Sequence, residues 1–258
     1  MRQATAAYEQ FERDGYAVFR HVLDSSCMAA VAEHVDWLTA RHPDIRPEHL
    51  GHELLADDPF WVDLIADERL LDVAEAFIGP DIALFASHYI SKPPFDGQAV
   101  LWHQDAAYWP LDPMDAVTLW LAVDEATTEN GCLRVIPGTH SMAVHPRRAS
   151  TDVVNVLSSE IDADVDESAA VDLVLSPGDV EVHHPGIVHG SGANPSPRRR
   201  CGLTIRYIPT STRILEPAWP CAFLLRGRPV PGVNDYVERP NFEPSRHFQP
   251  TSRSSTGG

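Results

Sequence analysis

The stretch Trp102-His-Gln-Asp105 closes a short segment, 99–105, whose apolar start and length are typical of a β-strand. In a strand, side chains two positions apart point to the same face, so His103 and Asp105 project together while Gln104 faces the other way. An imidazole and a carboxylate side by side on an inward face need compensation for their buried polarity, and a bound cation supplies it. We therefore predict that His103 and Asp105 are ligands of a metal ion.

A third ligand must come from elsewhere in the chain, and His183, His184 and His189 compete for the position. Pro185-Gly186 turns the chain just after the first two. His189, in contrast, runs directly into Gly190-Ser-Gly192, where small residues let backbone and ligand approach closely. Two histidines and one carboxylate can occupy one face of an octahedral Fe(II) and leave the opposite positions open. This reasoning favours His189 and leaves a pocket role for His184 open.

Four arginines follow the third histidine: Arg198, Arg199, Arg200 and Arg206. Arg200 is favoured by its distance from His189 as the group that holds the distal carboxylate of an oxo-acid, because a guanidinium can make two parallel hydrogen bonds to it. Arg206 lies deeper in the same predicted strand and is a candidate pocket residue. Arg198 and Arg199 are interpreted as the solvated end of a hairpin.

Three aromatic residues lie near these candidates in the sequence. Tyr108 and Trp109 follow Asp105 closely, so they are placed to cover the open side of the metal, although aromatic core packing is an alternative. Trp120, in the predicted strand 116–124, forms either part of the core or a wall of the oxo-acid pocket.

The first third of the chain has a helical pattern and the remainder has a strand pattern. Apolar residues recur at spacings of three and four from Met28 to Leu38, after a plausible N-cap at Asp24. A second apolar run, 60–78, stops at Gly79-Pro80. A short strand is predicted at 15–20. The later candidate strands are 82–90, 99–105, 116–124, 132–137, 171–175, 179–183 and 202–208, and Asn130-Gly131 is the strongest tight-turn signal between two of them.

So many short strands favour a sandwich or barrel with the metal ligands at its mouth. We predict one domain over residues 1–240, made of a helical part, 1–80, and a strand core, 82–210. Residues 141–170 are polar, increasingly acidic and too long for an ordinary connection, so they form either a lid or a solvated excursion. The polar tail, 241–258, is predicted to be flexible.

Composition excludes several classes of protein. With 258 residues, 43% of them hydrophobic, the chain can bury a substantial core. A formal net charge of −17 is unsuited to a nucleic-acid groove, which needs clustered Lys and Arg. No stretch approaches the ~20 apolar residues of a membrane span, the N-terminus lacks the apolar core of a signal peptide, and the four cysteines form no C-x-x-C pair. We expect a cytoplasmic protein and leave its oligomeric state open.

Several further motifs join those above into one pattern. They are S-K-P-P at 91–94, W-H-Q-D at 102–105, E-N-G-C-L-R-V-I-P-G-T-H at 129–140, P-G-D at 177–179 and H-G-S-G-A-N at 189–194, which precedes Arg200. Together they resemble the phytanoyl-CoA dioxygenase (PhyH-like) family of Fe(II)- and 2-oxoglutarate-dependent oxygenases, over residues 7–209. The resemblance implies a mainly β fold, a double-stranded β-helix (a cupin-like jelly roll) flanked by helices.

The resemblance also implies roles for particular residues. His103, Asp105 and His189 would be the iron ligands, and Arg200 would clamp the carboxylate of 2-oxoglutarate. Trp120 matches a family position that lines the 2-oxoglutarate site, and His88 matches a similar position. We place Ser191 in the same site, and Tyr108, Trp109 and Arg206 in the substrate pocket.

The expected reaction uses O2 and 2-oxoglutarate to hydroxylate, or otherwise oxidise, a C–H bond of a small soluble metabolite, with release of succinate and CO2. Family members that halogenate carry a small residue in place of the carboxylate, so Asp105 favours hydroxylation. An acyl-CoA substrate is not favoured, because its phosphates would need basic residues. The alternatives are a zinc-dependent hydrolase, which has no need of Arg200, and a non-catalytic sensor, which would be expected to have lost a ligand.

Overall fold

The computed structural model describes residues 2–150 and 152–251. Its helices come first, and nearly all of its strands follow them. The α-helices are α1 (Arg2–Asp14), α2 (Ser25–Arg41), α3 (His52–Leu55), α4 (Pro59–Ile65) and α5 (Glu68–Ile78). The strands are β1 (Tyr16–Phe19), β2 (Leu50–Gly51), β3 (Ile82–Lys92), β4 (Val100–His103), β5 (Leu111–Asp112), β6 (Val117–Ala122), β7 (Leu133–Ile136), β8 (Arg147–Ala149), β9 (Ser159–Ile161), β10 (Val171–Leu173), β11 (Val180–His183), β12 (Val188–Ser191), β13 (Arg200–Pro209), β14 (Arg213–Ile214) and β15 (Leu224–Arg226).

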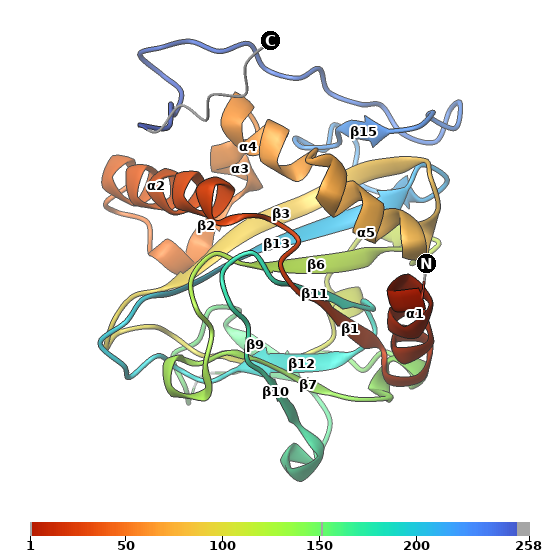
Figure 1. Ribbon diagram of the computed structural model, residues 1–258. Coiled ribbons are helices and arrows are strands. Elements are labelled where there is room, and N and C mark those ends of the chain that lie inside the picture. Colours follow the sequence, from red (N-terminus) through yellow and green to blue (C-terminus); the bar gives the residue numbers. More distant parts are fainter. Residues whose placement is uncertain (1, 151, 252–258) are drawn as a thin grey trace.

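Most of the strands form two facing antiparallel sheets, while β5 pairs with β14 and β8 pairs with β9 in separate two-stranded ribbons. The larger sheet has the order β1-β11-β6-β13-β3-β15, with β2 paired to β3, and the smaller has the order β10-β7-β12-β4. Helices α2, α4 and α5 cover the outer face of the larger sheet, and the smaller sheet lies on its other side (Figure 1). The fold is the mainly β double-stranded β-helix with flanking helices that the sequence predicted.

Strand alternation divides the larger sheet into an apolar face and a polar face. Its outer face carries fully buried residues such as Leu119, Val182 and Leu203, which join the helices in the main hydrophobic core. Its inner face carries a row of polar residues in register, because Arg206 pairs with Thr118 and Thr118 pairs with His183. The sheet therefore directs charged and hydroxyl groups into the space between the two sheets.

The helices largely follow the predicted pattern. Asp24 caps α2, and its side chain accepts hydrogen bonds from the backbone N–H groups of Ser26 and Cys27. The second apolar run, however, forms two helices, because Asp67 begins a new one by accepting from the N–H of Arg69. Helix α1 was not predicted as a separate element, although it lies in the part of the chain that was expected to be helical; Phe11 is its one buried apolar residue over 6–14.

The turn at Asn130-Gly131 has a different role from the one that its sequence suggests. Gly131 adopts a left-handed conformation, with φ of 78°. The strands on either side, β6 and β7, lie in different sheets and do not pair with each other. The turn therefore carries the chain from one sheet to the other instead of closing a hairpin.

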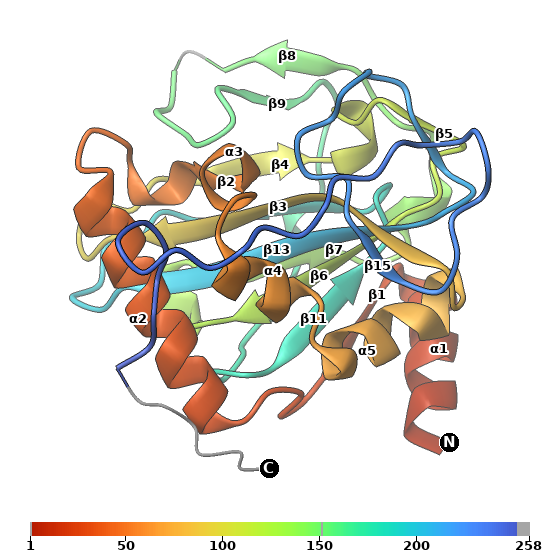
Figure 2. The ribbon, with the colours of Figure 1, turned by 90° about the horizontal axis from the view of Figure 1, so that it is seen from above.

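The two segments that stood apart in the sequence both pack on the body of the protein. Within 141–170, β8 and β9 form a two-stranded ribbon at one edge of the molecule, beside β4 (Figure 2). In the tail, residues 241–251 form no helix or strand, but Phe248 is only 6% exposed and packs against Phe60 and His34. Residues 252–258 lie outside the described part of the chain.

Over residues 2–150 and 152–251, the helices are all too short or too polar to cross a bilayer.

Candidate active site

Three predicted ligands meet between the two sheets. His103 ends β4 and His189 lies in β12, and the antiparallel register pairs these two residues directly. Asp105 lies beside them, with its Oδ1 atom 3.5 Å from Nε2 of His103. One ligand atom from each of the three residues lies within 4.8 Å of the other two, and all three residues are buried.

Asp105 reaches this cluster by a different backbone path from the predicted one. Strand β4 ends at His103, and only Gln104 continues in an extended conformation, with φ of −116° and ψ of 125°. Asp105 then begins a 3₁₀ helix, Asp105–Ala107. The strand prediction for residue 105 is therefore wrong, although the single extended residue still turns both side chains to one side.

Both imidazoles are oriented by their own backbone. Nδ1 of His103 lies 2.9 Å from the carbonyl oxygen of Leu101, and Nδ1 of His189 lies 3.1 Å from that of Ile187. A carbonyl only accepts, so each Nδ1 carries the proton and each Nε2 presents a lone pair. Burial and the neighbouring imidazoles also lower the pKa of His189 well below its usual value. Two neutral imidazoles and one carboxylate are a donor set that fits a divalent metal ion.

The second oxygen of Asp105 faces the polar row of the larger sheet. Oδ2 lies 3.3 Å from the Thr118 hydroxyl, and 3.7 Å from both Nε2 of His183 and Nε of Arg206. Burial acts to raise the pKa of Asp105, but the Arg206 charge and the nearby imidazoles outweigh it and hold this pKa well below the usual value. Asp105 is thus kept ionised, with one oxygen turned toward the two histidines.

His183 belongs to a separate buried pair. Its Nδ1 lies 2.8 Å from Oε2 of Glu181, and both residues are fully enclosed. Burial opposes protonation of His183, yet Glu181 and Asp105 raise its pKa to about 9. With this pKa both ring nitrogens of His183 carry protons at neutral pH, and His183 is not part of the group whose ligand atoms lie within 4.8 Å of one another, which separates it from His189.

Arg200 is a buried cation with no anionic partner. It is 1% exposed, and no carboxylate lies within 4.0 Å of its guanidinium among the described residues. Nε and Nη2 both donate to the carbonyl oxygen of Gly131, and the Trp120 ring centroid lies 5.4 Å away. Burial lowers the pKa of Arg200 to about 10. A buried guanidinium without a carboxylate partner among the described residues is suited to binding an anion from outside the chain.

Trp120 lies beside this guanidinium, and Ser191 lines the same cavity as Arg200. A side chain at Gly202 would meet the Trp120 ring at 2.1 Å, so glycine is needed for the indole to lie there. The Ser191 hydroxyl accepts from Nζ of Lys92 at 2.7 Å. Lys92 is fully buried, and burial together with the Arg200 charge lowers its pKa well below the usual value. Lys92 belongs to the S-K-P-P motif at 91–94, but no role was predicted for it.

These groups line one cavity with a volume of about 280 Å³. The predicted site residues all line it: the three ligands, Arg200, Trp120, His88, Ser191, Tyr108, Trp109 and Arg206. Its other walls include residues that sequence reasoning missed, namely His52, Phe85, Leu157, Glu216 and Trp219. No local motif marks His52, and Glu216 and Trp219 come from an irregular segment between β14 and β15.

Other candidates lie elsewhere. Nδ1 of His184 accepts from the backbone N–H of Gly186, and its ring contacts His140 outside the cavity. Arg198 pairs with Glu125 at the surface, and Arg199 pairs with Asp124.

The cavity is covered on one side by the ribbon of β8 and β9. The Tyr108 hydroxyl lies 2.7 Å from that of Ser159, and the Arg147 guanidinium lies 4.1 Å from the centre of the Tyr108 ring. Leu157, in the loop between the two strands, lines the cavity itself. Residues 141–170 therefore contribute to the wall of the site.

Comparisons with known proteins agree with this geometry. The family model for phytanoyl-CoA dioxygenase (PhyH) matches residues 11–202. A probable alpha-ketoglutarate-dependent hypophosphite dioxygenase of Stutzerimonas stutzeri is 34% identical over 160 residues, which are 61% of this chain and 54% of that protein. Human peroxisomal phytanoyl-CoA dioxygenase is 36% identical over 132 residues, 49% of this chain and 39% of that protein. The chain thus spans about half the length of these curated relatives.

Two further comparisons cover more of the chain. The ectoine dioxygenase of Sphingopyxis alaskensis is 27% identical over 242 residues, 84% of this chain and 78% of that protein. The solved structure of the non-heme monooxygenase ThoJ, in its apo form, superposes with a TM-score of 0.75 at 28% identity, over 90% of this chain and 87% of that one. The family match extends from Phe11, in α1, to Gly202, in β13, and includes every candidate ligand and Arg200. The chain belongs to the phytanoyl-CoA dioxygenase (PhyH) family.

Proposed function

We propose that this protein is an Fe(II)- and 2-oxoglutarate-dependent dioxygenase that oxidises a C–H bond of a small molecule. The observation that supports this most directly is the pairing, in one cavity, of a His-Asp-His cluster with a buried arginine that has no anionic partner. The cluster suits a divalent metal with open coordination positions, and the arginine suits the far carboxylate of a bound dicarboxylate.

His103, Asp105 and His189 would hold the iron, through Nε2 of each histidine and Oδ1 of the aspartate. The bound metal would supply activation of O2, so that 2-oxoglutarate, O2 and a C–H bond give succinate, CO2 and a C–OH bond. Thr118 would hold the free oxygen of Asp105 in place, and the carbonyls of Leu101 and Ile187 would keep the two imidazoles oriented. A fixed arrangement of this kind lowers the cost of ordering the reactants.

Arg200 would bind and orient the cosubstrate. Its guanidinium has donors beyond the two directed at Gly131, and an incoming carboxylate would neutralise its buried charge. Trp120 and the hydroxyl of Ser191 lie beside the same end of the cavity and would confine the cosubstrate chain. Lys92 would hold Ser191 in position through its hydrogen bond.

The size of the cavity restricts the substrate. About 280 Å³ is at the low end for ligand pockets and would have to enclose both the cosubstrate and the reacting part of the substrate. Its walls include the partly exposed aromatic residues Tyr108, Trp109 and Trp219, which would exclude water from a small reactant. We therefore propose that the substrate is a small metabolite. We also propose that the protein is soluble and cytoplasmic.

The two rival functions are less well supported by the site. A zinc hydrolase could use the same three ligands, but it would leave Arg200 buried without a partner. A non-catalytic sensor would be expected to have lost a ligand, and all three are present and close together.

Oxygen consumption and succinate formation would test the proposal. The purified protein should be loaded with Fe(II) under anaerobic conditions, mixed with 2-oxoglutarate, and then exposed to O2. We expect slow succinate formation without any added substrate, and none when Zn(II) replaces Fe(II). Zinc-dependent turnover without O2 uptake would instead support the hydrolase, and absence of a 2-oxoglutarate complex would refute the proposed function.

A further inference from the structure

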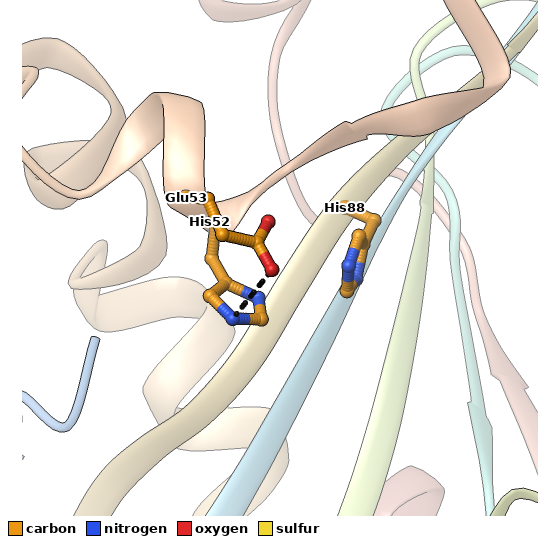
Figure 3. Close-up of side chains that lie close together, drawn as sticks. All are labelled: His52, Glu53 and His88. Carbon is orange, nitrogen blue, oxygen red and sulfur yellow. Dashed lines mark ion pairs between the residues drawn. The ribbon is translucent and has the colours of Figure 1, made fainter. Parts of the chain in front are cut away.

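A second cluster of ionisable side chains lies at the wall of the same cavity, away from the three candidate ligands. His52 and Glu53 come from α3, and His88 faces them from β3 (Figure 3). Nε2 of His52 lies 3.5 Å from Oε1 of Glu53, and the ligand atoms of the three residues lie within 4.8 Å of one another. By proximity alone, this cluster could be taken for a second metal site.

The hydrogen bond from Arg206 prevents His88 from binding a metal ion. Nη1 of Arg206 lies 2.8 Å from Nδ1 of His88, and because a guanidinium can only donate, Nδ1 must be the acceptor. A neutral imidazole that accepts at Nδ1 carries its proton at Nε2. Neither nitrogen of His88 then has a lone pair free for a cation, and the adjacent guanidinium charge would repel one. The third member, Glu53, has a side chain that is 67% exposed.

The same hydrogen bonding leaves N–H groups of Arg206 and His88 as hydrogen-bond donors on this wall of the cavity. Arg206 has a side chain that is 13% exposed, its Nε atom has no hydrogen-bond partner, and its guanidinium lies 5.4 Å from the centre of the Trp109 ring. Nε2–H of His88 has no acceptor among the described residues, and both residues line the cavity. His52 packs its ring against those of His88 and Trp219. Burial and the Arg206 charge lower the pKa of both histidines, which keeps them neutral donors.

Among the described residues Arg206 has Asp105 as its carboxylate neighbour, with Nε 3.7 Å from Oδ2, but in the loaded site the charge of Asp105 also balances the metal. This step rests on the proposed function. The two charges of the metal would be balanced by Asp105 and by the C1 carboxylate of 2-oxoglutarate, and Arg200 by the distal carboxylate. Glu181 is occupied by His183, whose Nδ1 lies 2.8 Å from its Oε2, and Lys92 adds no negative charge to the cavity. The positive charge of Arg206 therefore remains.

Other charged groups near the opening do not offset it. Glu216 is exposed, as is Glu53, so solvent screens both carboxylates. Arg206, in contrast, acts within the enclosed part of the cavity, where an unpaired charge is costly.

We infer that the substrate is a small organic anion, whose carboxylate is bound by Arg206 and Nε2–H of His88 while its apolar or planar body packs against Trp109 and Trp219. Phe85 supports this aromatic wall, since its ring stacks on Trp219 with centroids 5.0 Å apart. The inference assigns Arg206 and His88 to substrate recognition and gives the substrate class by its charge.

Binding of simple carboxylates would test the inference without knowledge of the natural substrate. Protein loaded anaerobically with Fe(II) and saturating 2-oxoglutarate should be titrated by calorimetry with benzoate, its neutral analogue benzamide, benzylamine and acetate. The 2-oxoglutarate–iron absorption band, followed in the same samples, shows whether a probe displaces the cosubstrate. We expect benzoate to bind in preference to benzamide and benzylamine, with the band perturbed but retained.

The variant Arg206→Met should weaken benzoate binding on the order of tenfold to a hundredfold, as expected for loss of hydrogen bonds to a charged group. The surface variant Arg198→Met should not change it. His88→Phe should weaken benzoate binding while His88→Gln, which keeps a side-chain N–H donor, should retain part of it. The His88 pair keeps the test decisive if Arg206→Met does not fold.

Several outcomes would overturn the inference. They are failure of both carboxylates to bind, equal affinity for benzoate and benzamide, and unchanged benzoate affinity in both Arg206→Met and His88→Phe. A titration with Ni(II) should give one metal per chain, and a second site that is lost in His52→Phe would show that the cluster binds a cation. If no 2-oxoglutarate complex forms in the wild-type protein, the proposed function fails as well; if the complex forms and benzoate does not bind, this inference alone fails.

Discussion

Replacing Arg200 with methionine should separate cosubstrate binding from metal binding. The wild-type guanidinium is 1% exposed, has no carboxylate within 4.0 Å among the described residues, and has two of its N–H groups on Gly131. A carboxylate that arrives in this enclosed position would gain charge-assisted hydrogen bonds worth about 2–5 kcal/mol. We therefore expect the Kd for 2-oxoglutarate to rise by roughly thirtyfold to several thousandfold in Arg200→Met.

The free protein should respond differently from the complex. Loss of the bonds to the Gly131 carbonyl leaves a buried acceptor unsatisfied, which costs about 1–3 kcal/mol. Removal of a buried charge that has no counterion stabilises the folded protein and so offsets this cost. The melting temperature of the metal-loaded protein should therefore change little, whereas the increase that 2-oxoglutarate produces in the wild type should disappear.

Anaerobic titration of the Fe(II) protein with 2-oxoglutarate, followed by its absorption band, measures this Kd, and iron content is measured on the same samples. Arg198→Met is the matched control, because Arg198 is half exposed and pairs with Glu125. An unchanged Kd in Arg200→Met, with a raised one in Arg206→Met, would refute the assignment and move the clamp to Arg206. Loss of iron in Arg200→Met would show that the residue supports the metal site instead.

Further predictions concern other parts of the site and the fold. His103→Ala, Asp105→Ala and His189→Ala should each lose stoichiometric Fe(II) in elemental analysis while His183→Ala retains it; the reverse result for His183 and His189 would change the third ligand. Gly202→Ala should lower the free energy of unfolding by roughly 1–3 kcal/mol in urea titrations and weaken 2-oxoglutarate binding, because its Cβ would meet the Trp120 ring at 2.1 Å; unchanged stability would show that the indole can move. Desolvation lowers the pKa of buried His34 although Asp58 acts to raise it. As pH falls, the unfolded state therefore binds a proton at this residue before the folded state does, and the free energy of unfolding should decrease below about pH 6.5. A His34→Gln variant whose stability depends on pH in the same way would contradict this. With an accepted substrate in saturating chloride, the product should gain oxygen and no chlorine in mass spectra, and free CoA should not compete.

Local sequence patterns were sufficient for the parts of this protein that depend on neighbouring residues. The N-cap at Asp24 and the helix end at Gly79 follow from side-chain and backbone preferences that act within a few residues. The alternation of strand residues likewise brought Arg200 and Arg206 to the same cavity. Such features need no knowledge of the rest of the chain.

Features that depend on distant contacts were not predictable. Asn130-Gly131 has the composition of a hairpin turn, yet the strands it joins belong to different sheets, because pairing partners are chosen over the whole chain. His52 enters the cavity from a single helical turn, and Trp219 enters from an irregular segment. Neither residue lies in a periodic pattern, so only the folded chain brings them to the site.

The separate environments of the histidines show how one fold can use the same residue type in several ways. His103 and His189 donate from Nδ1 to backbone carbonyls, which frees Nε2 for a metal. His88 has the opposite arrangement, since Arg206 occupies Nδ1 and leaves Nε2 with its proton. His183 lies against Glu181 and has a raised pKa of about 9, so both of its nitrogens carry protons and neither has a lone pair for a cation. The hydrogen-bond partner of each ring therefore decides whether it can ligate, donate or share a proton, and proximity of histidines alone does not identify a metal site.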